Sequence, residues 1–157
     1  MKRKWLKLAA VIGMSVCLLS GCGAAGVKTI VPADLATDLY EGVTWKDQLS
    51  EVDLNKALTL YGIDSSAVSA GSVYMGTNAT AEEVAVLEAA SADDVATVED
   101  GVNARVEAQL ASFQSYNAEE VPKLENPYIV TKGNYVILCV CDDTTQAEKI
   151  VEDCFSE

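Results

Sequence analysis

The sequence predicts an α+β domain, a mainly antiparallel four-stranded sheet with helices packed on one face. Two observations predict it. Two strand pairs, each joined by a short turn-like segment, are each followed by a helical pattern, which gives the order ββαββα after two N-terminal helices. The chain of 157 residues is 50% hydrophobic, enough for one domain with a real core. We expect a signal segment at residues 1–21, a tether at 22–31 and a single domain at 32–157.

Two short helices are expected before the first strand. Apolar residues at helical spacing indicate a helix over about Pro32–Tyr40. Ser50 and Asp53 resemble a capping box for a second helix, and Gly62 is placed to end it. The apolar face of this second helix comprises Leu54, Ala57, Leu58 and Tyr61.

The first strand pair is predicted at Val68–Met75 and Glu82–Glu88, where β-branched and aromatic residues gather. The intervening residues 76–80 are turn-like, so the two strands should form a hairpin.

The strongest helical pattern follows this hairpin. Ser91 can cap the helix, and Gly101 within it costs about 1 kcal/mol relative to alanine. One long apolar stripe comprises Val95, Val98, Val102, Val106, Leu110 and Phe113. Such a stripe is typical of a helix that packs on a sheet rather than of a cofactor site.

The last third of the chain should be a polar loop, a hairpin and a helix. The loop is Asn117–Asn126, and the strands are Tyr128–Thr131 and Tyr135–Cys141. Residues 132–134 suit a tight turn, because their central glycine can adopt positive φ. The second strand is apolar on both faces, which predicts an interior position in the sheet. A final helix should start near Asp142 and bury Ala147, Ile150, Val151 and Cys154.

Residues 1–21 have the three parts of a secretion signal. Four basic residues come first, and the apolar run Leu8–Leu19 is shorter than the roughly 20 residues that span a bilayer. Leu19–Cys22 resembles the bacterial lipobox, which implies cleavage between Gly21 and Cys22 and lipidation of the Cys22 thiol. Acyl chains such as palmitate would then anchor the protein to the outer face of the cell membrane. The alternatives are an ordinary secretory signal with an incidental cysteine and an uncleaved signal anchor.

Charge and composition exclude several classes of function. The net charge falls from −13 to −17 once the four basic residues of the signal are removed. An acidic surface repels nucleic acid, anionic headgroups and anionic wall polymers, so we expect no nucleic-acid partner. The chain has no histidine, which excludes Ser-His-Asp and Cys-His catalysis and His-based metal sites. We expect no metal and no cofactor.

Three cysteines are candidates for a disulfide. Cys17 leaves with the signal and Cys22 is alkylated, so Cys139, Cys141 and Cys154 stay available. A bridge from the helical Cys154 to either strand cysteine is conceivable, whereas one between the two strand cysteines is less favourable. The alternative is three buried thiols that act as small hydrophobic side chains.

Other residue clusters point less clearly to chemistry. Acidic pairs recur at Glu82-Glu83, Asp93-Asp94, Glu119-Glu120 and Asp142-Asp143. Calcium binding or glycosidase chemistry would need several of them to converge, and helix capping and solvated surface explain most of them. Five aromatic residues could line a pocket, although they suit the core better: Trp45, Tyr74, Phe113, Tyr128 and Tyr135.

The stretch Ser112–Asp143 resembles one family of lipoproteins from low-GC Gram-positive bacteria, classed as a domain of unknown function. Its aromatic-rich helix end, the KLEN loop and the Lys-Gly-Asn-Tyr turn carry the resemblance, and Tyr61–Asp64 also fits. The resemblance implies a lipid-anchored domain outside the cell membrane, with no known catalytic residue, cofactor or substrate. The double cysteine of the last strand departs from the aliphatic run typical of the family.

These observations favour a noncatalytic, membrane-anchored module that binds or assists another envelope component. The second hypothesis is a receptor for a small ligand, either a cation or a peptide, which predicts a concave pocket. The third is a carboxylate- or thiol-based enzyme, which predicts perturbed carboxylates or a reactive thiolate in a cleft.

Overall fold

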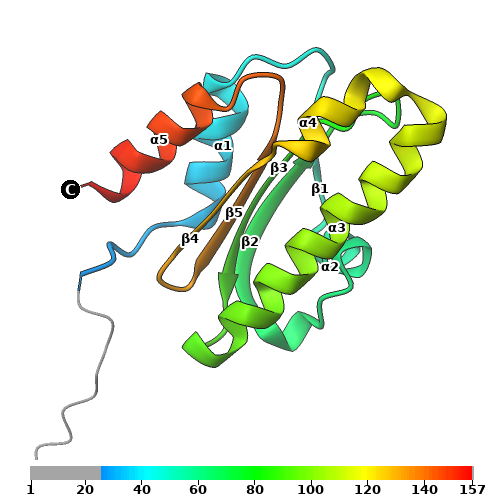
Figure 1. Cartoon of the computed structure of the whole chain (residues 1–157). Coiled ribbons are helices and arrows are strands. Elements are labelled where there is room, and N and C mark those ends of the chain that lie inside the picture. Colours follow the sequence, from blue (N-terminus) through cyan, green and yellow to red (C-terminus); the bar gives the residue numbers. More distant parts are fainter. Residues whose placement is uncertain (1–25, 157) are drawn as a thin grey trace, which may run out of the picture.

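A five-stranded antiparallel sheet organises the chain in the order β1-β2-β3-β5-β4 (Figure 1). The structure is a computed structural model that describes residues 26–156. The strands are β1 (Ser50–Val52), β2 (Val68–Met75), β3 (Glu83–Ala89), β4 (Tyr128–Lys132) and β5 (Tyr135–Val140). Both predicted hairpins are present, and β5 lies between β3 and β4 as expected.

Five α-helices accompany the sheet in the described part of the chain. They are α1 (Pro32–Gly42), α2 (Leu54–Tyr61), α3 (Val95–Tyr116), α4 (Val121–Glu125) and α5 (Thr145–Phe155). The α+β class is therefore confirmed, and four of these helices lie where the apolar spacing predicts them.

The prediction that all helices pack on one face is wrong. Helices α2, α3 and α4 cover one face of the sheet, and α1 and α5 cover the other (Figure 1). The reason lies in strand β3, where Val84 and Val86 face one core and Ala85 and Leu87 face the other, each fully buried. Because such a strand is apolar on both faces, helices must pack on both faces of the sheet to remove it from water.

The sheet has five strands and not the predicted four. The additional strand is the segment before α2, which was expected to cap that helix. Ser50 pairs with Met75 in β1, so it takes no part in a capping box. Asp53 alone caps α2, accepting a hydrogen bond of 3.1 Å from the Lys56 N–H. Gly62 ends the helix in the left-handed conformation, as predicted.

The predicted apolar stripe of α3 packs on the sheet, with Val98 and Val102 fully buried. Ser91 precedes a single 3₁₀ turn rather than capping α3 directly. Gly101 is required by close packing, because a Cβ built there would lie 2.2 Å from Cγ1 of Ile63. The helix therefore approaches the segment after α2 more closely than an alanine would allow.

The expected polar loop at 117–126 is largely helical. A 3₁₀ turn at Ala118–Glu120 leads directly into α4. Pro122 lies in the first turn of α4, where a backbone N–H would have no partner within the helix, so proline is tolerated there. This short helix buries Lys123 and Leu124. It therefore brings a charged residue to the end of the sheet.

The chain enters the domain beside the β4–β5 hairpin. The turn glycine, Gly133, has φ +60 as predicted, and a Cβ built on it would lie 3.2 Å from Cβ of Val27. The Tyr135 hydroxyl lies 3.3 Å from both the N–H and the carbonyl oxygen of Ile30. Residues 27–30 therefore lie against the hairpin end of the sheet.

Candidate functional site

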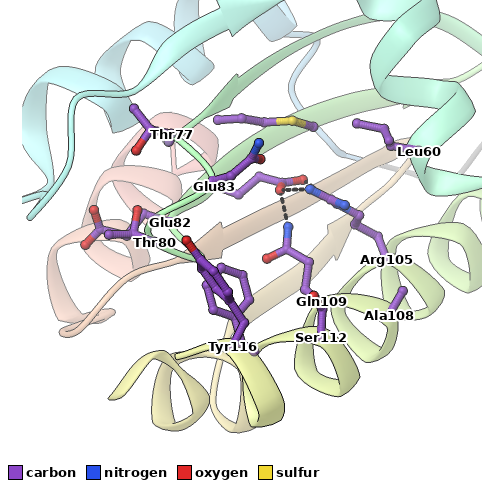
Figure 2. A pocket seen from close by; sticks show the side chains of 14 residues that line it. Leu60, Thr77, Thr80, Glu82, Glu83, Arg105, Ala108, Gln109, Ser112 and Tyr116 are labelled. Carbon is purple, nitrogen blue, oxygen red and sulfur yellow. Dashed lines mark hydrogen bonds and ion pairs between the residues drawn. The ribbon is translucent and has the colours of Figure 1, made fainter. Parts of the chain in front are cut away.

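A pocket of about 490 Å³ opens between α3, the end of α2 and the β2–β3 hairpin (Figure 2). Its volume is within the range typical of ligand sites. The lining residues are Leu60, Met75, Gly76, Thr77, Asn78, Thr80, Glu82, Glu83, Arg105, Ala108, Gln109, Ser112, Phe113 and Tyr116.

The floor of the pocket is the buried carboxylate of Glu83. Arg105 donates to it through Nη2 at 2.8 Å and Nε at 3.3 Å, and Gln109 donates through Nε2 at 2.6 Å. The Tyr61 hydroxyl adds a bond of 2.5 Å. Arg105 and Gln109 are four residues apart on α3, so both reach the carboxylate from one helix face (Figure 2).

These four donors fill the acceptor positions of the Glu83 carboxylate. The network also affects the phenol: burial first, and then the adjacent negative charge of Glu83, raise the pKa of Tyr61 well above 10.0. The Glu83 carboxylate is therefore engaged by side chains of the protein itself, with no acceptor position left for a metal ion or a substrate.

Two polar groups in this network still have bonding capacity. Oε1 of Gln109 is buried without a hydrogen-bond partner, while its amide nitrogen is held by Glu83. Nη1 of Arg105 makes no hydrogen bond with any residue of the described segment 26–156. A buried acceptor without a partner costs roughly 1–3 kcal/mol, so this position favours a group that donates a hydrogen bond.

The rim of the pocket is apolar and open. Leu60 is 52% exposed and Tyr116 is 68% exposed. The Tyr116 ring meets the buried ring of Phe113 edge-on, with centroids 5.9 Å apart. These rings make an apolar wall beside the polar floor.

A second buried charge cluster lies next to the first. Glu82 accepts bonds from the backbone N–H groups of Lys46 and Asp47, at 2.9–3.1 Å, and from Nζ of Lys123 at 3.0 Å. Lys123 also binds Glu120 at 2.9 Å, and Glu120 in turn accepts from the Ala81 N–H at 2.9 Å. This cluster ties α4 and the segment after α1 to the start of β3.

Burial lowers the pKa of Lys123, but the hydrogen bonds that its ammonium donates to Glu120 and Glu82, together with the negative charges of those carboxylates, outweigh burial and raise the pKa overall. The lysine therefore stays charged at neutral pH.

The expectation that surface exposure and capping explain the acidic pairs is wrong for Glu82-Glu83, since both side chains are buried. A signal for this was present in the sequence: Glu83 alternates with Ala85 and Leu87 on one strand face. Glu120 is also buried. Asp142 stays half exposed and pairs with Lys46 at 3.1 Å. In the described residues no group of three or more acidic, cysteine or histidine side chains could hold a metal ion.

Cys139 and Cys141 share one face of the sheet, as predicted, with sulfurs 3.7 Å apart. Both are buried in the core beneath α1 and α5, and the half-buried Cys154 packs against the same core. The hydrogen bond to Cys141 and then burial raise the pKa of the Cys139 thiol. The structure has all three as free thiols, and thiol counting on the unfolded, unreduced protein tests whether the conceivable bridge to Cys154 forms.

The five aromatic candidates do not gather at one site. Phe113 lines the α3 pocket, whereas Tyr74 stacks on Tyr40 with centroids 4.9 Å apart. The Trp45 indole N–H donates to the Tyr40 carbonyl at 2.8 Å. The rim residues Leu60 and Tyr116 were not among the candidates, since a single exposed apolar residue carries no periodic signal.

The fold and the site define a small α+β domain with a pocket beside α3 whose buried charges are paired within the protein. The chain belongs to the family described as a domain of unknown function, DUF4358, whose model matches residues 43–141. The match runs from the end of α1 to the end of β5, so it includes the sheet, α3 and both charge clusters. No curated protein and no solved structure matches the chain.

The predicted cleavage and lipidation site, Gly21 and Cys22, lies outside the described residues. Within residues 26–156, no helix is long and apolar enough to cross a membrane.

Proposed function

We propose that this protein is a lipid-anchored, noncatalytic module on the outer face of the cell membrane, and that it binds another envelope component in the α3 pocket. The anchor is the lipid on Cys22, inferred from the lipobox at Leu19–Cys22. The observation that carries the binding role is the pocket, with its open apolar rim and its saturated charged floor.

The state of the floor favours binding over catalysis. A general acid or base needs a carboxyl group that can exchange a proton with a substrate. Glu83 already accepts four hydrogen bonds, and Glu82 is held by two backbone N–H groups and Lys123. Neither carboxylate is available for such a role, and the chain has no histidine to replace them.

The entry point of the chain supports an outward-facing pocket. Residues 27–30 lie at the hairpin end of the sheet, near Tyr135, whereas the pocket lies at the end where Glu83 pairs with Val140. The five residue-to-residue steps of β5 from Tyr135 to Val140 correspond to about 17 Å. From Cys22 to Val27 the chain can span at most about 18 Å, so the hairpin end would stay close to the membrane.

A receptor for a small ligand is the second candidate, and the pocket volume favours it directly. It predicts a ligand-dependent rise in melting temperature without any protein partner in the pocket.

Photo-crosslinking in the cell tests the proposal. A photoreactive phenylalanine analogue replaces Tyr116 at the rim in one strain and Val31 in a matched control, since these positions are 68% and 57% exposed. We expect a discrete adduct with one envelope component from position 116 and none from position 31. The adduct should disappear when Ala108→Phe fills the pocket from the exposed side of α3.

The same adducts from both positions, or an adduct that survives Ala108→Phe, would show that the pocket is not the binding site. A labelled fatty acid should enter the wild-type protein and be absent from Cys22→Ala. Label that stays in this variant would remove the anchor from the proposal.

A further inference from the structure

We propose that the α3 pocket binds a neutral peptide segment, taking one apolar side chain at the rim and the backbone amide of the same residue at the polar floor. The inference rests on the proposed binding function and names the ligand class of that site.

The first argument is the buried acceptor. Oε1 of Gln109 has no partner, and its orientation is set because the amide nitrogen donates to Glu83 at 2.6 Å. A flipped amide would place this oxygen against the carboxylate, which is unfavourable. Figure 2 shows the Gln109 oxygen directed toward the side where the Tyr116 ring lies. The oxygen therefore lacks an N–H or O–H donor, and a ligand supplies one when it moves aside the side chains that cover this atom.

The second argument is a donor beside that acceptor. Arg105 uses Nε and Nη2 for Glu83, which leaves Nη1 unbonded within the described residues. Its side chain is 19% exposed and lines the pocket. Arg105 and Gln109 are four residues apart on α3, so one helix face carries both a donor and an acceptor, the two kinds of group that the C=O and N–H of a peptide backbone bind.

The third argument is the apolar wall. Leu60, Met75 and the rings of Phe113 and Tyr116 surround the polar floor. Leu60 and Tyr116 are two of the four large hydrophobic side chains that are exposed in residues 26–156. An aliphatic or aromatic side chain of the ligand would remove this surface from water.

The charges of the protein further limit the class of ligand. The mature chain carries −17, which disfavours an anionic ligand. The guanidinium of Arg105 disfavours a cation, and both carboxylates are already saturated. A saccharide would need several free polar partners around an aromatic platform. Of the polar side chains in the lining, Thr77 and Thr80 already donate to Asp47, at 2.6 and 3.0 Å, whereas Asn78 and Ser112 make no side-chain hydrogen bond within residues 26–156, so a saccharide is tested beside the peptides.

Binding of capped tripeptides to the full-length protein in detergent tests this proposal by calorimetry. The probes are N-acetyl-Ala-Leu-Ala-amide, the same peptide with Lys or Glu at the centre, the N-methyl-leucine form, and chitotriose. We expect the leucine peptide to bind at least tenfold more tightly than the lysine and glutamate peptides. The N-methyl form, which lacks the central donor, should bind about tenfold more weakly than the leucine peptide.

Variants at exposed positions locate the site without disturbing the fold. Leu60→Ser and Tyr116→Ser should each weaken the leucine peptide at least fivefold, and Ala108→Phe should abolish its binding. Val31→Ser, an equally exposed apolar position outside the pocket, should leave binding unchanged. Melting temperatures of all four variants confirm that they are folded.

Chitotriose binding that depends on Tyr116 while the peptides do not bind would overturn the peptide class. Equal binding of the leucine and N-methyl peptides would overturn the role of the Gln109 oxygen. If no peptide binds but the crosslink from position 116 persists and is lost in Ala108→Phe, the ligand class is wrong and the binding function stands. Loss of both would overturn the two proposals together.

Discussion

Glu82 and Glu83 are consecutive, both buried, and both saturated with hydrogen bonds, yet they serve different parts of the molecule. Glu82 is paired with Lys123, whose side chain is 1% exposed, inside a cluster closed off from solvent. Glu83 is paired with Arg105, whose side chain is 19% exposed and forms part of the pocket wall. Glu82 holds α4 and the segment after α1 against the sheet. Glu83 holds Arg105 in the wall of the pocket.

The comparison shows that two equally buried carboxylates can differ in how close their charged partners lie to solvent. What differs is the exposure of the partner. Removing one partner of a fully buried ion pair is strongly destabilising, because the charge that is left has no access to water. When the lost partner lay at a pocket, water can enter and partly solvate the charge that is left.

The largest effect is expected for Lys123→Met. It leaves Glu82 and Glu120 buried without their shared cation, so unfolding should become easier by about 3–5 kcal/mol. Urea denaturation followed by circular dichroism measures it. Lys149→Met, which breaks the exposed pair with Asp153, is the matched control and should change stability by less than about 0.5 kcal/mol. Equal effects of the two variants would contradict the sealed-cluster interpretation.

Arg105→Met should destabilise less, by about 2–3 kcal/mol, because Tyr61 and Gln109 still donate to Glu83 and the pocket admits water. The same urea titration compares it with Lys123→Met. If Arg105→Met proved the more damaging, the contrast between a closed and an open cluster would fail.

Alkaline pH should weaken both clusters. The pKa values of Tyr61 and Lys123 are raised in the folded state, so the unfolded chain releases these protons first, near 10.0 and 10.5. The stability that they contribute is complete below pH 10 and is lost as the pH rises above it, by up to about 1.4 kcal/mol per pH unit for each group. Thermal melts between pH 8 and 11 measure the slope. Tyr61→Phe, which cannot ionise, should flatten it, and an unchanged slope would exclude Tyr61 as a source.

The smallest effect on stability is expected at the rim. Tyr116→Ser and Leu60→Ser remove exposed side chains, so the free energy of unfolding should change by less than about 0.5 kcal/mol. Thermal melts check this beside the binding measurement. A decrease of more than about 2 kcal/mol in the free energy of unfolding would mean that the rim side chains belong to the core. The distinction between the pocket and the Glu82–Lys123 cluster would then fail.

The local patterns of the chain predicted much of the fold. The α3 stripe, the two hairpins and the turn at Gly133 all follow from spacing or from a backbone preference within a few residues. Strand β1 could not be found this way. It is three residues long and is defined by its pairing with β2, which is distant in sequence.

The candidate site was predicted poorly. Glu82-Glu83 reads as one more solvated acidic pair in a chain with 24 acidic residues. Their burial depends on Lys123 and Arg105, which come 41 and 22 residues later, on α4 and α3. No spacing rule links residues so far apart.

The sequence by itself determined the α+β class, most helix and strand positions, the absence of histidine chemistry and the family to which the chain belongs. Only the tertiary structure decided that helices cover both faces of the sheet, that two adjacent glutamates are buried, and that a pocket opens beside one of them. The physical reason is range: propensity and periodicity act within a few residues, whereas the burial of a charge is set by partners that only folding brings into contact.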